Sequence, residues 1–189
     1  MAVSRHHFDG ERNRELMGLD TRSELAARSL AELGRSGLEL RLRWICALQQ
    51  GGIDSERALE RYIDWAAETG AGEICFKELY VSSSVESVYY AREANRWSRE
   101  HQVSLRLVTD FMANRGFEVA ERLPWGAPIF EGAWNGRRLR IAAYTEPSIS
   151  WELRNGLCRS WNLMADGRCL ASLEDSGSEV VPKDRPDLK

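Results

Sequence analysis

The chain has 189 residues, of which 43% are hydrophobic and 29% are charged, and this composition supports one sizeable core and excludes a disordered or fibrous protein. The formal net charge of -3 excludes binding to nucleic acid or anionic lipid through bulk charge. No stretch approaches the roughly 20 apolar residues of a membrane span, and the charged residues 1–20 do not resemble a signal peptide. We therefore expect a cytoplasmic protein without a membrane partner.

The first part of the chain predicts a helix followed by a strand. A capping box at residues 21–24, Thr-Arg-Ser-Glu, begins a helix that Gly34 ends. Residues 38–48 alternate at first and then become continuously apolar. This change is typical of a central strand in a sheet that is covered on both faces.

A second helix and a second strand follow. Asp54 caps the helix, apolar residues recur at helical spacing, and Gly70 closes it. Residues 73–79 then predict a short strand. A strand, a helix and a strand in this order require a right-handed crossover, so we expect the two strands to form a parallel pair.

The middle of the chain gives weaker signals. A capping box at residues 83–86, Ser-Ser-Val-Glu, predicts a third helix from Ser83 or Ser84 to about His101. Residues 104–108 are consistent with one further strand, and residues 109–116 with a helical turn or a loop.

From Leu123 onwards the pattern changes to short β runs divided by turn dipeptides. Asn135-Gly136 and Asp166-Gly167 favour the positive φ angles of tight hairpin turns, so two antiparallel hairpins are expected.

We therefore divide the chain into three parts. Residues 1–122 hold the parallel strands with their crossover helices, and residues 123–173 form a β-rich C-terminal extension of antiparallel hairpins. Residues 174–189 lack an apolar period and are predicted to be a disordered tail. The fold class is α/β.

The four cysteines do not predict a metal site. Cys46, Cys75, Cys158 and Cys169 are too far apart for the close spacings of zinc or iron-sulfur ligands. Two of them fall in apolar runs, where a thiol packs as a small hydrophobe. We expect free thiols and no disulfide framework.

The candidate site lies where parallel strands end. Residues 3–9 read as the end of a strand that runs into a polar loop, and residues 48–51 and 79–82 follow the two strands above. The carboxyl ends of parallel strands form the rim at which α/β sheets bind ligands. His6 and His7 could ligate a metal there, but adjacent side chains of an extended chain face opposite sides, which favours one buried and one solvated histidine.

Two further groups near the strands have two interpretations each. Glu78 could point into a barrel with Lys77 outward, or the two could simply alternate along a strand. Residues 82–84, Ser-Ser-Ser, resemble a phosphate-binding turn but lack its glycines, which favours helix capping.

The first hairpin carries Trp134, Arg137, Arg138 and Arg140. These side chains could stack on and neutralise a single strand of RNA. Four residues are a small footprint in an acidic chain, so we favour a solvated hairpin tip and do not expect a nucleic-acid partner.

Three segments resemble a known family when they are taken in order. They are Val-Ser-Arg-His-His-Phe-Asp at residues 3–9, with Asn13 and Met17 following, then Leu-Arg-Leu-Arg-Trp-Ile-Cys-Ala-Leu-Gln-Gln-Gly-Gly-Ile-Asp at 40–54, and Glu-Ile-Cys-Phe-Lys-Glu-Leu-Tyr at 73–80. Their order and spacing resemble the later strands of a radical S-adenosylmethionine (SAM) domain. The likeness covers about residues 1–101.

The resemblance implies a partial, truncated TIM-like barrel in which residues 3–4, 38–48 and 73–79 are strands four to six. It implies SAM and a [4Fe-4S] cluster as cofactors. Carried over to this chain, Ser4 and Arg43 would meet the amino-acid end of SAM, and the backbone of Leu79 and Tyr80 would meet its adenine.

The chain departs from the family at the cluster. The motif Cys-x3-Cys-x2-Cys and the Gly-Gly-Glu stretch, which the family carries before these strands, do not occur in this sequence. The chain alone therefore cannot hold the cluster in the family's way, and we expect no metal ligands and no catalysis from it alone.

Three functions remain open. The chain is a half-enzyme that needs an N-terminal half-barrel polypeptide, or a catalytically inactive binding or scaffold protein that associates with a partner or with itself, or a small RNA-binding module. Substrate, reaction and oligomeric state are not encoded in any motif of the sequence.

Overall fold

The computed structural model describes residues 1–18, 25, 29, 32, 41–83, 85, 87–158, 160–172, 175 and 177–180. The chain divides into two compact units. The first comprises Met1–Leu79 and Glu100–Glu146, and the second comprises Tyr80–Arg99 and Pro147–Lys189. In the described part of the chain, no helix is long and apolar enough to cross a membrane.

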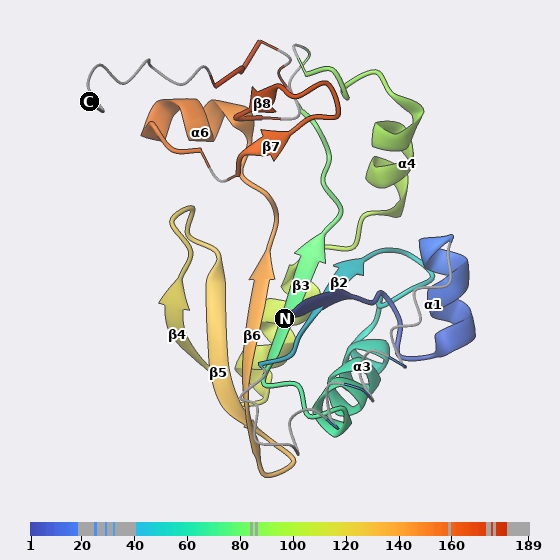
Figure 1. The fold of residues 1–189 in the computed structure, drawn as a ribbon. Coiled ribbons are helices and arrows are strands. Elements are labelled where there is room, and N and C mark those ends of the chain that lie inside the picture. Colours follow the sequence, from blue (N-terminus) through green and yellow to red (C-terminus); the bar gives the residue numbers. More distant parts are fainter. Residues whose placement is uncertain are drawn as a thin grey trace. The chain divides into compact units, whose positions relative to one another are not determined.

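A six-stranded, mostly parallel sheet forms the centre of the first unit (Figure 1). Its order is β1-β2-β3-β6-β5-β4, and β5 runs opposite to the other five strands. The strands are β1 (Ala2–Ser4), β2 (Arg43–Leu48), β3 (Glu73–Glu78), β4 (Glu118–Arg122), β5 (Pro128–Trp134) and β6 (Arg137–Tyr144). The expected parallel pair of β2 and β3 is confirmed.

The hairpin of β5 and β6 turns at Asn135 and Gly136, whose φ angles are 47° and 76°. The Asn-Gly dipeptide supplies these positive φ angles, and the predicted hairpin is confirmed. β6 also pairs in parallel with β3, so this hairpin extends the sheet that the first strands begin.

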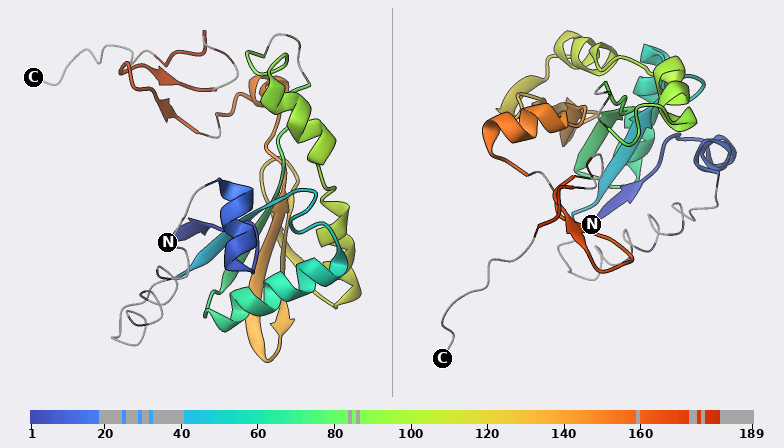
Figure 2. Two further views of the ribbon diagram at one scale, coloured as in Figure 1. Left: turned by 90° about the vertical axis from the view of Figure 1, so that its right-hand side faces the viewer. Right: turned by 90° about the horizontal axis from the view of Figure 1, so that it is seen from above.

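Helices α3 (Glu56–Glu68) and α5 (Arg106–Asn114) lie on one face of the sheet (Figure 2). Helix α1 (Gly10–Met17) follows β1, and Asp9 caps its first turn. The N-cap of α3 is Ser55, whose side chain accepts from the Ala58 N–H. The sequence predicted Asp54 as this cap, but its carboxylate accepts from the Gly51 N–H and thereby fixes the turn before the helix.

The core lies between these helices and the sheet. Every second side chain of a strand points to the same face, so one face can be apolar along its whole width. The strands bury Trp44, Cys46, Leu48, Ile74, Phe76, Phe130, Trp134, Leu139, Ile141 and Ala143, and the helices bury Leu59, Tyr62, Ile63, Ala66, Val108, Phe111 and Met112 against them.

The second unit contains α6 (Ile149–Asn155) and most of α4 (Glu93–His101). It also contains a separate two-stranded antiparallel sheet of β7 (Asn162–Leu163) and β8 (Cys169–Leu170). This short sheet confirms the second predicted hairpin, and Gly167 turns it with a φ of 86°.

The strand predicted at residues 104–108 is wrong, because this segment begins α5. Val108, Phe111 and Met112 recur at helical spacing and are buried. This apolar stripe packs on the sheet and stabilises the helical conformation. The short alternating run at residues 104–108 did not indicate this helix.

The start of the third predicted helix is also wrong. α4 begins at Glu93, and turns that join Ser87 to Tyr90 and Tyr89 to Arg92 precede it. Ser82 instead exchanges two hydrogen bonds with the side chain of Asn95.

Of the helix predicted at 21–34, Leu25, Ser29 and Glu32 are among the described residues, and all three are helical. Of the predicted disordered tail, Asp175 and residues 177–180 are described. Glu179 bridges to Leu170 and the Val180 N–H donates to the Cys169 carbonyl, so this part of the tail is ordered and the prediction is wrong for it.

Candidate functional site

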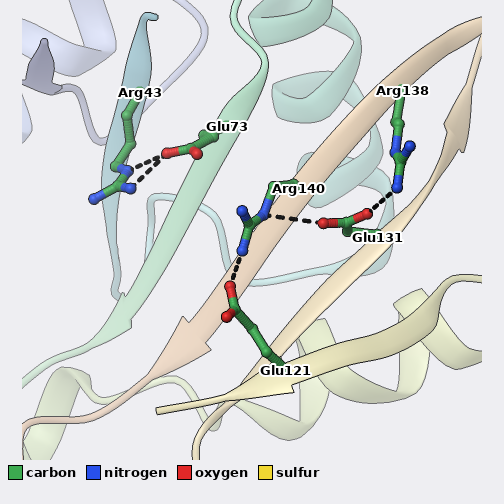
Figure 3. Close-up of polar contacts among 6 residues, drawn as sticks. All are labelled: Arg43, Glu73, Glu121, Glu131, Arg138 and Arg140. Carbon is green, nitrogen blue, oxygen red and sulfur yellow. Dashed lines mark hydrogen bonds and ion pairs between the residues drawn. The ribbon is translucent and has the colours of Figure 1, made fainter.

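The second face of the sheet, opposite α3 and α5, carries a row of charged side chains (Figure 3). The register sets Arg43, Glu73, Arg140 and Glu131 side by side on four neighbouring strands. Arg138 lies two residues before Arg140 on β6 and pairs with Glu131. Charges of alternating sign stabilise neighbouring strands of a sheet.

Each arginine of the row has defined partners. Arg43 Nε donates to Glu73 Oε2 at 2.6 Å. Arg140 pairs through Nε with Glu131 Oε1 at 3.2 Å and through Nη2 with Glu121 of β4. The row is therefore held in place by ion pairs that join β2 to β3 and β6 to β5 and β4.

A cavity of about 350 Å³ opens on this face. Trp125, from the turn between β4 and β5, forms one wall together with Tyr144, and their rings meet edge to face at 5.8 Å and 70°. The cavity is lined by Arg43, Ile45, Glu73, Ile74, Cys75, Glu121, Leu123, Trp125, Ile129, Arg140, Ala142 and Tyr144. Its volume is in the range of small-molecule sites, and its lining is mostly apolar with a few polar groups.

The Cys75 thiol lies in this cavity and is not a ready nucleophile. Burial raises its pKa, although the Tyr144 side chain as a hydrogen-bond partner and the nearby Lys77 act in the opposite direction. Burial likewise raises the pKa of Tyr144. Both groups are therefore protonated at neutral pH and can serve as hydrogen-bond donors.

The carboxyl ends of β1, β2 and β3 form the second candidate region, which was predicted from the sequence. Arg5 is buried just after β1, and its guanidinium donates to the carbonyls of His7 and Phe8 at 2.9 and 2.8 Å. Its charge lies 4.4 Å from the centre of the Trp65 ring. These contacts fix the loop from β1 to α1.

Both histidines of this loop accept backbone hydrogen bonds. His6 Nδ1 accepts from the Ala47 N–H at 3.0 Å, and His7 Nδ1 from the Asp9 N–H at 3.1 Å. Asn13 Oδ1 accepts from the N–H groups of both histidines. Both side chains are partly buried, so the expected pair of one buried and one solvated histidine is wrong, because each ring packs against its own backbone donor.

These histidines predict a pH dependence of stability. Burial lowers the pKa of His6 and of His7 below 6.5, so on acidification the unfolded chain takes up their protons first. Their contribution to stability is present above pH 6.5 and is lost as pH falls through the folded pKa, at up to about 1.4 kcal/mol per pH unit for one proton. Urea titrations at a series of pH values should show this loss, and His6→Gln should flatten it. An unchanged slope in that variant would contradict the assignment.

The predicted site residues lie in three places. Ser4 ends β1 beside Ile45, and Arg43 begins β2 beside Glu73. Leu79 follows the carboxyl end of β3, six residues beyond Glu73, which is roughly 20 Å along the strand. The structure therefore does not bring Arg43 and Leu79 together. Tyr80 begins the second unit.

Of the two interpretations of Lys77 and Glu78, the structure supports simple alternation along the strand and not a Glu78 that points into a barrel. Lys77 lies on the second face, where it pairs with Glu146 and stacks on Tyr144. Glu78, the next residue of β3, therefore points to the side of the helices. Burial raises the pKa of Glu78.

Trp134 does not belong to an exposed stacking surface. It is 6% exposed, contacts Phe111 and Phe117, and donates from Nε1 to Asp64 Oδ1 at 2.8 Å. Both interpretations of Trp134, the favoured solvated hairpin tip and the RNA-stacking role, are therefore wrong, because its ring completes the core. Arg138 and Arg140 are engaged in the charged row.

The described residues do not fit an iron-sulfur cluster. Cys46 and Cys75 are buried free thiols, and the alternation of β2 and β3 turns them to opposite faces of the sheet, since Cys46 pairs with Phe76 and Cys75 with Ile45. Among the described residues there is no group of three His, Cys, Asp or Glu side chains that could hold a metal ion.

The cavity on the second face was not predicted from the sequence. The sequence feature that could have indicated it is the alternation of polar and apolar residues in 137–144. We had assigned this segment to a separate extension. Comparison with known proteins adds nothing to the geometry: no protein-family model matches the chain, and no curated protein matches it.

Proposed function

We propose that this chain supplies three strands of a radical SAM-type partial barrel and needs a second polypeptide segment, which holds the cluster, for its chemistry. β1, β2 and β3 are parallel and follow chain order, and α3 and α5 cover one face of their sheet. A barrel of this type requires parallel strands with helices outside and a second face turned inward. This arrangement supports the proposal together with the resemblance of residues 1–101.

The outer edge of β1 is the observation that carries the proposal. The Met1 carbonyl accepts from the Arg43 N–H, and the Arg5 N–H donates to the Ile45 carbonyl. Backbone groups alternate along a strand, so Ala2 and Ser4 direct their N–H and C=O groups away from β2. Among the described residues, β1 pairs with β2 only. Such an edge can accept another strand.

Ser4 and Leu79 are the residues of the first unit that we assign to SAM. The Ser4 side chain lies on the second face at the carboxyl end of β1, where its hydroxyl can donate to a carboxylate. The Leu79 carbonyl already accepts from Gln102 Nε2 at 2.9 Å, which fixes the backbone at the end of β3. In the family, the cluster delivers an electron to the SAM sulfonium; this chain's part is to bind and orient SAM.

Equilibrium binding tests the proposal. The chain is purified alone and together with a segment that carries Cys-x3-Cys-x2-Cys and strands one to three, taken from the DNA immediately upstream of the Met1 codon. We expect SAM to bind the pair and not the chain alone, because half of its contacts come from the other segment. Ser4→Ala should weaken binding by about 1 kcal/mol, the value of one hydrogen bond.

A proline variant tests the edge of β1 directly. Ala2→Pro removes an N–H that faces away from β2, a change that edge strands tolerate. We expect the variant to fold normally and to lose at least about tenfold in affinity for the other segment, whereas Ala2→Ser should assemble like the parent. Equal SAM affinity with and without the segment, or an upstream DNA that encodes no such segment, would overturn the half-barrel proposal.

A binding protein without catalysis is the second candidate. The cavity on the second face favours it, because this site is complete within the first unit. SAM binding that is independent of any other segment would favour this candidate.

A further inference from the structure

We propose that the cavity on the second face binds an L-amino acid with an aromatic side chain, in its zwitterionic form. The proposal rests on the charges and walls of the cavity and does not depend on the half-barrel. It names a ligand class for a cavity in which the resemblance assigns a role to Arg43 alone.

The charged rim of the cavity is electrically balanced. Arg43 and Arg140 supply two positive charges, and Glu73 and Glu121 supply two negative charges. A net anion or a net cation would add an uncompensated charge to this partly desolvated site, which is costly. A zwitterion adds none and can still form ion pairs of both kinds.

Both the arginines and the glutamates of the rim keep hydrogen-bonding groups that are available to a ligand. Arg43 engages Nε and Nη2 with Glu73 Oε2, and Arg140 engages Nε and Nη2 with Glu131 and Glu121 Oε1. Among the described residues, neither Nη1 group has a hydrogen-bond partner, and neither do Glu73 Oε1 and Glu121 Oε2. A guanidinium has five donors in a planar fork that matches a carboxylate, and a carboxylate oxygen accepts from an ammonium group.

The walls of the cavity determine which side chain the ligand carries. The edge-to-face pair of Trp125 and Tyr144 borders the cavity. The floor is one row of neighbours across the sheet, which runs Ile45, Cys75, Ala142 and Ile129. A flat aromatic ring fits between an aromatic wall and an apolar floor, since offset and edge-to-face contacts of rings add to the gain from burial.

The orientation follows from the register. Arg43, Glu73 and Arg140 belong to the row nearer the amino ends of the parallel strands, and Tyr144 lies on β6 four residues after Arg140. The ammonium and carboxylate groups of the ligand therefore lie over the charged row, and its ring extends along the strands towards Tyr144.

Binding of 5-fluoro-L-tryptophan, followed by ¹⁹F NMR on the full chain, tests the proposal. Fluorine reports on the ligand alone, which matters because the chain has 7 tryptophans. We expect saturable line broadening that L-tryptophan reverses. Tryptamine lacks the carboxylate and indole-3-propionate lacks the ammonium group, so each should compete at least about tenfold less well.

Variants place the site. Arg140→Gln and Trp125→Leu should each weaken binding at least about tenfold, and so should Arg43→Gln combined with Glu73→Gln, a pair of changes that keeps the rim neutral. Arg138→Gln is the matched control, because Arg138 pairs with Glu131 but does not line the cavity, and it should bind like the parent. Circular dichroism confirms the fold of each variant.

Four results would overturn the proposal. The first three are equal competition by tryptamine or indole-3-propionate, unchanged affinity in all cavity variants, and no binding of 5-fluoro-L-tryptophan. Displacement of the probe by S-adenosylhomocysteine with higher affinity than L-tryptophan would also overturn it, and would assign the cavity to adenosyl ligands. The half-barrel proposal is tested separately by SAM binding to the assembled pair, so the two can fail independently.

Discussion

Replacing Trp44 with alanine should cost about 4 kcal/mol of the free energy of unfolding, within the roughly 3–5 kcal/mol of large aromatic deletions in a core. Trp44 is 0% exposed, and its ring lies 4.8 Å from that of Trp65 on α3. Its Nε1 donates to Thr69 Oγ1 at 2.9 Å. The variant loses the contacts that join the second strand of the sheet to α3 and leaves a cavity that the sheet cannot close.

Trp161→Ala is the matched control within the same chain. Trp161 is 73% exposed, so the same deletion should change stability by no more than about 0.5 kcal/mol. Urea unfolding followed by far-ultraviolet circular dichroism compares the two variants. Similar midpoints in both would show that α3 does not depend on Trp44 for its position.

The sequence was a good guide where local signals and the core agreed. The strand of residues 73–79, the helix after Asp54 and the Asn135-Gly136 turn were predicted within a few residues of β3, α3 and the hairpin of β5 and β6. In each case an apolar period matches the element's own geometry, and a cap or a turn residue marks its end.

The pairing of strands that are distant in the chain could not be predicted from the sequence. Nothing local in residues 137–144 indicates that β6 pairs with β3, because sheet partners are chosen by burial of a whole face and not by neighbours in sequence. The same reason explains the missed cavity. Arg43, Glu73 and Arg140 lie far apart in the chain and meet only through the register.

The site predicted at the carboxyl ends of the strands was identified only in part. Residues 3–9 were identified correctly as a strand that enters a polar loop, but the role of Arg5 was missed. A charged residue one position after a strand reads as solvent-exposed. Here it is 1% exposed, because backbone carbonyls of the following loop turn inward to meet it.

Arg5→Met should therefore destabilise the protein by about 3 kcal/mol, although methionine keeps the apolar part of the side chain. The carbonyls of His7 and Phe8 would lose the donors that reach them at 2.9 and 2.8 Å. A buried acceptor without a donor costs about 1–3 kcal/mol, and hydrogen bonds from a charged group are stronger than average. The contact with the Trp65 ring is lost as well.

Arg14→Met is the control, because Arg14 lies exposed on α1 and should change stability by no more than about 0.5 kcal/mol. Limited proteolysis adds a local readout. In Arg5→Met the loop at residues 6–9 should be cleaved faster under native conditions, since the guanidinium no longer binds the carbonyls of His7 and Phe8, whereas Arg14→Met should be cleaved like the parent. If both variants unfold at the same urea concentration and resist protease equally, water replaces the guanidinium at these carbonyls, and the loop that carries His6 and His7 does not depend on Arg5.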